Sequence, residues 1–300
     1  MASELAPELL ETIFGHVLAD SGDMETLAAS SLAFPRYTTL FQRALCSKKP
    51  LTLSFNRNTD KDPRLRKMIN TLVDLLGANP RFGALLGPDV RFHFCNSPEF
   101  LSDSRAAKIA RCCSSTDSGI VSLTIKILDG GGSWNDLSEE ARRALEGVIV
   151  NSPRLNTLKL VSMGIPWSTF LRQKPFLDYL VLHGGCYCVP RPPCSEPLPA
   201  AKPNDDGHKP TRIGRISGSP SELHRLAEAL YDTVDADGKD AALAIDLSHL
   251  RALVAICKYD GGAMELRRFL HRTHRLEGLT VRTLSCTSLL DPLHVFYYEL

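Results

Sequence analysis

The chain carries almost no excess of charge of either sign. Its 300 residues include 35 basic and 34 acidic side chains, which leaves a formal net charge of +1. Proteins that bind nucleic-acid backbones or anionic membranes usually present a strong positive field. We therefore expect neither a nucleic acid nor a membrane among the partners of this chain.

Long apolar runs and a secretory leader are also lacking. The first residues, 1–4, hold no basic n-region, and no stretch reaches the ~18 uninterrupted apolar residues that would cross a membrane. The 9 cysteines are odd in number and scattered, so we interpret them as reduced thiols rather than as a disulfide framework. These features predict an intracellular protein, cytoplasmic or nuclear.

What the chain does contain is an internal repeat. Residues 153–160 and 175–182 both read P-x-L-x-x-L-x-L, and the corresponding leucines Leu155 and Leu177 stand 22 positions apart. A period of this length is typical of stacked units, each too small to bury its own apolar face. The leucines are therefore expected to form a core shared between neighbouring units, and such scaffolds usually serve as binding surfaces.

Related frames of the form L-x-x-L-x-L recur at irregular spacing, beginning at Ile120, Ala242 and Leu276. Alternating apolar residues also predict strands at 51–55 and 90–94. Helices are predicted after N-cap residues at four places: Asp62-Pro63, Asp103, Asp136 with Glu139, and Ser219-Pro220-Ser221-Glu222. The first of these helices is expected to bury an apolar stripe: Leu65, Met68, Ile69, Leu72, Val73 and Leu76.

Together these units resemble a degenerate leucine-rich-repeat protein, which implies an irregular α/β solenoid over residues 47–300. A proline-rich stretch at 184–210 is predicted to be a loop or disordered insertion. In the full repeat an Asn or Cys after the frame bonds the turn backbone, so here the turns must be satisfied otherwise. That slot holds Leu128, Met163, Gly185, Leu250 and Leu284. The alternative is an ordinary α/β domain containing two similar strands.

The first 46 residues predict three short helices. In the first helix, apolar residues at 5, 9, 10, 13, 14 and 17 form one face, with Pro7 and Glu8 in its first turn. Asp23 can cap the second helix, and residues 37–45 mark the third. Three helices in ~40 residues have little room for a core of their own, so an exposed apolar face is expected.

This N-terminal order of residues resembles an F-box, the adaptor-binding motif of cullin-RING ubiquitin ligases. The resemblance covers residues 1–46. It implies that a Skp-type adaptor is bound by Leu5, Pro7, Leu9, Leu10, Ile13, Phe14, Leu27, Leu32 and Phe34. With the repeats, it predicts a non-enzymatic substrate-recognition subunit of an SCF-type ligase that holds a protein client and needs no cofactor. The alternatives are that residues 1–46 only cap the solenoid, and that the chain is an interaction scaffold outside ubiquitin ligation.

Two further groups of residues suggest sites. A basic cluster near the C-terminus is either a solvated helix end or a patch for an anion or acidic partner. Its members are Arg267, Arg268, His271, Arg272 and Arg275.

The thiols of Cys186, Cys188 and Cys194 lie near His183 in the sequence, but their spacing is not that of common zinc pairs, so we predict no metal. The glycine-rich stretch 129–133 lacks the lysine of a phosphate loop and is predicted to be a turn.

Overall fold

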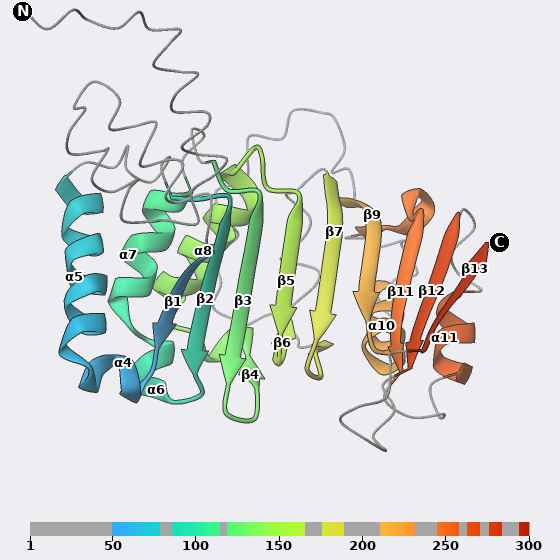
Figure 1. Ribbon diagram of the computed structural model, residues 1–300, viewed down its shortest axis with the longest axis horizontal. Helices are drawn as coiled ribbons and strands as arrows, with labels where there is room; N and C mark the ends of the chain where they lie inside the picture. The colour runs from blue at the N-terminus through green and yellow to red at the C-terminus, as the bar shows by residue number, and fades with distance from the viewer. Residues whose placement is uncertain are drawn as a thin grey trace, which may run out of the picture.

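A large parallel β-sheet with helices packed on it forms the described part of the molecule, so the chain is an α/β protein, as predicted (Figure 1). The computed structural model describes residues 50–78, 86–114, 119–165, 176–188, 211–231, 245–257, 263–270, 276–283 and 294–299. No helix in these ranges is long and apolar enough to span a membrane.

Strands of the main sheet lie side by side in the order in which they occur along the chain. Each neighbouring pair is parallel, except that the last strand runs antiparallel to the one before it. The strands of this path are β1 (Leu51–Phe55), β2 (Asp89–Cys95), β3 (Ser122–Leu128), β5 (Thr157–Val161), β7 (Phe176–His183), β9 (Thr211–Gly218), β11 (Ala252–Cys257), β12 (Gly278–Thr283) and β13 (His294–Glu299).

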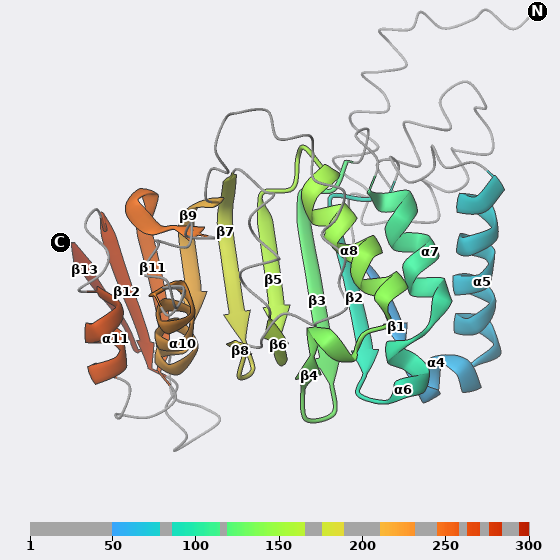
Figure 2. The same ribbon diagram turned by 180° about the vertical axis from the view of Figure 1, so that it is seen from behind.

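The longer helices all lie on one face of this sheet (Figures 1 and 2). They are α5 (Pro63–Ala78), α7 (Ser104–Cys113), α8 (Glu139–Asn151), α10 (Pro220–Tyr231) and α11 (Ala263–Leu270). Parallel neighbours need a crossover between them, and crossovers of constant hand that always advance in one direction place their helices on the same side. No described helix covers the opposite face, which we call the helix-free face.

The remaining short elements near the strand ends are α4 (Arg57–Lys61), α6 (Pro98–Leu101), η3 (Trp134–Asp136), β10 (Ile245–Asp246) and η4 (Leu247–His249).

Helix starts were well predicted where the cap is local. The N–H of Arg64 donates to Asp62 Oδ1 at 2.8 Å, and the N–H of Arg105 donates to Asp103 Oδ1 at 2.8 Å. The prediction for α8 was displaced: its N-cap is Ser138, whose Oγ accepts from the N–H of Ala141. Asp136 instead closes the preceding 3-10 turn, where its carboxylate accepts from the N–H of Ser133.

The predicted buried stripe of α5 is only partly buried. Ile69 and Leu76 are buried, whereas Leu65 and Met68 remain 41% and 49% exposed. Leu75, outside the predicted stripe, is 47% exposed. α5 is the first of the longer helices that the structure describes. Its main neighbours among the described helices are α7 and α4, and neither covers the flank that holds Leu65 and Met68.

The core is a set of apolar rows that cross the strands in register. One row joins residues that pair directly from strand to strand and are buried: Val90, Leu123, Leu158, Leu180, Ile216, Leu253 and Leu279. The second and third leucines of the frames at 155 and 177 therefore lie opposite one another, as the repeat predicts. Burying one such side chain contributes about 1.5–3 kcal/mol, so these rows dominate the stability of the sheet.

Two frames differ from the prediction. The frame at Ala242 falls partly on β10, a short strand that pairs with the start of β9 outside the main path. The corresponding place in the main sheet belongs to Leu250-x-x-Leu253-x-Ala255 on β11, and Ile213-x-x-Ile216-x-Gly218 supplies another on β9. Smaller residues stand at the third position of both frames, which hid them from a search for leucine.

Tight turns at the carboxyl ends of β3, β5 and β7 carry a second, three-stranded sheet of β4 (Gly132–Ser133), β6 (Met163–Ile165) and β8 (Tyr187–Cys188). The predicted turn at 129–133 is confirmed, and β8 lies inside the stretch predicted as an insertion. Backbone bonds join successive turns: the N–H of Gly132 donates to Ser162 O at 3.1 Å, and the N–H of Ser162 donates to His183 O at 2.8 Å. These bonds satisfy turns that lack the Asn or Cys of the full repeat.

Candidate functional site

The helix-free face is built from alternate residues of the strands. On β2, β3 and β5 the residues that point toward the helices are apolar and buried, so the residues between them lie on the other face. Because the strands are in register, these intervening residues also form rows. One row reads Thr52, Arg91, Thr124, Lys159, Val181 and Ser217 across six strands.

Three cationic side chains of this face surround one threonine. Thr124 pairs with Arg91 on one side and with Lys159 on the other, while Lys126 lies two residues further along β3. Neighbouring strands lie about 5 Å apart, and diagonal neighbours lie roughly 7–8 Å apart. The three long side chains can therefore reach one group bound over Thr124. We call Arg91, Thr124, Lys126 and Lys159 the Thr124 cluster.

The cluster has a positive electrostatic environment. Arg91 donates to Asp89 Oδ2 at 2.7 Å, whereas neither lysine forms an ion pair with a residue that the structure describes. His93 pairs with Lys126 in the sheet, and burial, Lys126 and Arg91 together lower the pKa of its imidazole. That lowered pKa indicates that a positive charge is unfavourable at His93, first because the side chain is partly buried and then because Lys126 and Arg91 are close.

Two hydroxyl groups at the cluster have no hydrogen-bond partner among the residues that the structure describes. They are Oγ1 of Thr124, which is only 7% exposed, and Oγ of Ser122, two residues earlier. An unpaired buried hydroxyl costs about 1–3 kcal/mol relative to a satisfied one. Such groups are unusual in native structures and call for a physical explanation.

Apolar and aromatic side chains continue the face beyond the cluster. Half-buried Val161 pairs with Lys126, and half-buried Val181 pairs with Lys159. Further on, the Arg215 guanidinium lies 5.3 Å from the ring centre of Tyr179. The face therefore offers three cations at the cluster and, beyond them, valine side chains and the contact between Arg215 and Tyr179.

The sequence-predicted adaptor-binding residues, Leu5 to Phe34, lie outside the described residues, so their role stays a prediction. Within the predicted basic patch, Arg267 is exposed on α11, and Arg268 lies on the same helix. His271, Arg272 and Arg275 fall outside the described ranges. The patch therefore also remains a prediction.

Cys186 has a structural role in the turn after β7. Its buried thiol donates to Leu160 O at 3.2 Å, and burial raises its pKa to about 11. A thiol in this environment stays protonated at neutral pH. His183 is exposed, Cys194 lies outside the described residues, and those residues include no group of three or more His, Cys, Asp or Glu placed to hold a metal ion.

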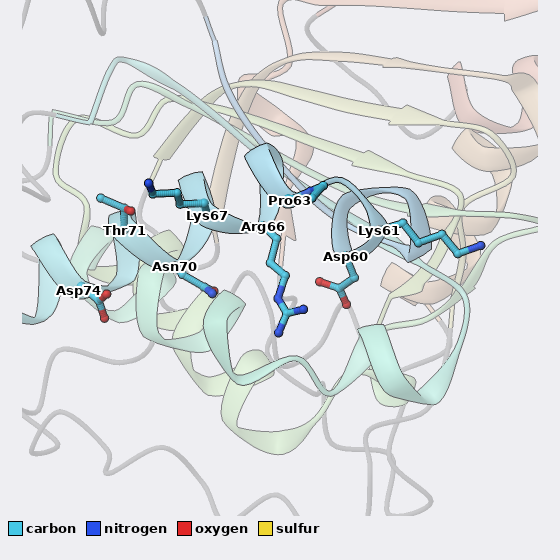
Figure 3. Close-up of a pocket in the computed structure, with 8 residues that line it drawn as sticks. All are labelled: Asp60, Lys61, Pro63, Arg66, Lys67, Asn70, Thr71 and Asp74. Carbon is cyan, nitrogen blue, oxygen red and sulfur yellow. The ribbon is translucent and has the colours of Figure 1, made fainter.

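A shallow depression runs along α4 and α5 (Figure 3). It has a volume of about 530 Å³, and its lining includes charges of both signs, with Arg66 and Asp60 pointing toward one another. Asp60 also accepts a hydrogen bond from Arg105 at 2.8 Å. The residues that line this depression carry charges of both signs and include no buried polar group without a hydrogen-bond partner, so it is a weaker candidate than the Thr124 cluster.

The sequence carried a signal for the cluster that reasoning from leucines missed. Arg91, Lys126 and Lys159 each stand directly beside core residues of their strands, at intervening positions. Aligning those positions between units would have placed the cations together.

Comparison with protein families, with curated proteins and with solved structures gives no match.

Proposed function

We propose that the chain is a substrate-recognition subunit of an SCF-type cullin-RING ubiquitin ligase. In this proposal residues 1–46 bind a Skp-type adaptor, and a solenoid of β/α units holds a protein client on its helix-free face. The observation that supports it best is the arrangement of strands in chain order with the longer helices on one side. Such an arrangement leaves a broad sheet face for a partner, as repeat scaffolds do.

The proposed activity is positioning rather than bond-making chemistry. The adaptor end would connect the chain to the ubiquitin-transferring machinery, and the sheet face would hold the client beside it. Linking two binding events through one rigid body raises the effective concentration of the client's lysines near the transfer site. No group of this chain needs to act on the client.

Adaptor capture by the purified full chain tests the proposal. Wild-type protein should retain a recombinant Skp-type adaptor in a pull-down, and Leu9→Asp with Ile13→Asp should abolish retention because both lie on the predicted apolar face. Thr12→Asp is the matched control, since Thr12 occupies a variable position of the F-box pattern beside Ile13. Capture that is equal in all three proteins, or absent from wild type, would refute the ligase role.

A second candidate is an interaction scaffold in which residues 1–46 only cap the core. The exposed apolar flank of α5, with Leu65, Met68 and Leu75, favours it because terminal units of a repeat array need cover. Deletion of residues 1–46 distinguishes the two. If residues 1–46 are a cap, the chain that lacks them should aggregate, and replacing Leu65, Met68 and Leu75 by serine should make it soluble again. If residues 1–46 are a tether, the chain that lacks them should be soluble without those replacements.

A further inference from the structure

The charges of the Thr124 cluster sum to a value that suits a doubly charged anion. Arg91, Lys126 and Lys159 carry three positive charges, and Asp89, bonded to Arg91, carries one negative charge, which leaves two positive charges. The lowered pKa keeps His93 neutral at pH 7. Asp89 engages Nε and Nη2 of Arg91, so Nη1 of the same guanidinium is free to face a ligand.

The base of the cluster offers an unused donor. Thr124 Oγ1 has no partner among protein atoms, and its residue is more than nine-tenths buried between strands that carry Arg91 and Lys159. An anionic oxygen placed between the long side chains could accept a hydrogen bond from the Thr124 hydroxyl. Hydrogen bonds to charged groups are roughly twice as strong as neutral ones, so the ligand would remove the penalty of the unpaired hydroxyl.

Along the row that contains Thr124 the positive charge is local, and Arg215, further along the face, forms an ion pair with Asp178. In the row that contains Thr124, the residues beyond Lys159 are neutral: Val181, Ser217, Val254 and Thr280. A nucleic-acid backbone needs a track of cations along its length. One dianionic group flanked by apolar side chains fits this surface better, because Val161 and Val181 lie next to the lysines.

We propose that the Thr124 cluster binds a dianionic group on an extended segment of a client protein, either a phosphoryl group or the carboxylates of two residues on the same face of that segment. Phosphoserine and phosphothreonine carry a charge of about −1.5 to −2 and three acceptor oxygens, which matches three cations and one hydroxyl. The inference rests on the proposed function for the identity of the partner as a client. The binding itself does not depend on the adaptor.

Fluorescence anisotropy with the full chain tests the site. The probes are three labelled nine-residue peptides that place Val-X-Val at their centre, with X as phosphoserine, Glu-Ser-Glu or serine, and a nine-nucleotide oligo-dT. In an extended peptide the two glutamates of Glu-Ser-Glu lie on one face. We expect the phosphoserine or Glu-Ser-Glu peptide to bind at least tenfold more tightly than the serine peptide. The tighter of the two anionic peptides identifies the source of the charge. Equal binding of all three peptides, or tighter binding of oligo-dT, would overturn the proposal.

Charge-matched variants separate the site from general electrostatics. Lys126→Gln with Lys159→Gln should weaken binding of the anionic peptide at least tenfold. Lys67→Gln with Lys108→Gln changes the net charge equally at exposed positions on the helices and should leave binding within twofold. Equal losses in both double variants would refute a defined site.

Thr124→Val tests the buried donor with a readout that a structural role would not give. We expect binding of the anionic peptide to fall about tenfold while the melting temperature of the free protein stays level or rises, because valine removes an unpaired hydroxyl. Unchanged affinity, or a lower melting temperature with the affinity loss, would exclude Oγ1 as a ligand donor.

The two proposals fail separately. If the chain binds the peptide but captures no adaptor, the ligase role is refuted and the anion site stands. If it captures the adaptor but does not bind the peptide, only the anion site is refuted.

Discussion

Glu222 should be one of the most sensitive side chains in this protein. It lies in the first turn of α10, is 3% exposed, and accepts three backbone hydrogen bonds. Its Oε2 accepts from the N–H of Ser219 at 2.7 Å, which is the predicted capping bond. Its Oε1 accepts from Gly185 and Cys186 at 2.6 and 3.0 Å, so the same carboxylate holds the turn after β7 against α10.

Glu222→Gln keeps the shape of the side chain but replaces one acceptor oxygen with an amide donor. If the remaining oxygen continues to accept from the turn, the amide NH₂ faces the N–H of Ser219, and one charge-assisted bond is lost. Such a bond contributes about 1.5–3 kcal/mol. The lower cost of burying a neutral group offsets part of the weakening at the other two bonds. We therefore expect a loss of about 2–3 kcal/mol in the free energy of unfolding.

Thermal and urea unfolding of wild type and variant measure this loss. A domain of this size shifts its melting temperature by about 2–4 °C per kcal/mol, so the expected decrease is roughly 4–12 °C. Native-state hydrogen exchange should also speed up at the amides of Gly185 and Cys186, as their acceptor weakens. Glu99→Gln is the control, because Glu99 is exposed in the first turn of α6.

A loss below about 0.5 kcal/mol for Glu222→Gln, the size typical of ordinary surface changes, would refute the reasoning. The same conclusion would follow if Glu99→Gln destabilised the protein as much. Unaltered exchange at Gly185 and Cys186 would show that the turn does not depend on the carboxylate.

Two further predictions concern the same turns. Burial raises the pKa of Cys186 from 9.0 to about 11, so the unfolded chain loses this proton first as the pH rises, and the free energy of unfolding should fall from about pH 9 upward, by about 1 kcal/mol at pH 10. Urea unfolding measured against pH should show a shallower fall in Cys186→Ala than in wild type. Identical slopes in the two proteins would contradict the assignment. Gly184 and Gly185 both have positive φ, but a Cβ at Gly184 would lie 2.3 Å from Ser162 Oγ, whereas one at Gly185 meets nothing within 4 Å. Both alanine variants should lose about 1 kcal/mol from backbone strain, and Gly184→Ala should lose about 1 kcal/mol more. Adding Ser162→Ala to Gly184→Ala should recover that extra loss, and a double-mutant cycle without coupling would disprove the contact.

Local interactions explain which parts of the fold could be predicted from sequence. Asp62, Asp103 and Ser219 bond to N–H groups two or three residues away, so the residues that start these helices are neighbours in the chain. The strand at 51–55 and the frames at 155 and 177 were recognisable because their apolar spacing follows the strand period. Predictions of this kind required no knowledge of long-range packing.

Predictions failed where distant packing decided the outcome, and at the start of α8, where two local caps competed. Leu65 and Met68 fit the apolar arc of α5, but burial depends on what packs against each flank, and that helix is first in its row. Asp136 matches the sequence of a capping box, yet the chain enters a 3-10 turn first and Ser138 takes the N-cap. The frame at Ala242 looked suitable, whereas the register of the parallel sheet selected Leu253.

The sequence by itself determined the α/β class, the helix starts at Asp62, Asp103 and Ser219, and the apolar rows, because caps and periodicity act over a few residues. The tertiary structure decided that Arg91, Lys126 and Lys159 meet around Thr124 and that Glu222 reaches the turn at Gly185. Arg91, Lys126 and Lys159 follow one another at intervals of about 30 or more positions, and Glu222 lies as far from Gly185, so only the strand register and the crossover geometry bring them together. Charge at the intervening positions contributes nothing to the core, so no pattern within one unit reveals the cluster, which becomes visible only when the units are aligned with one another.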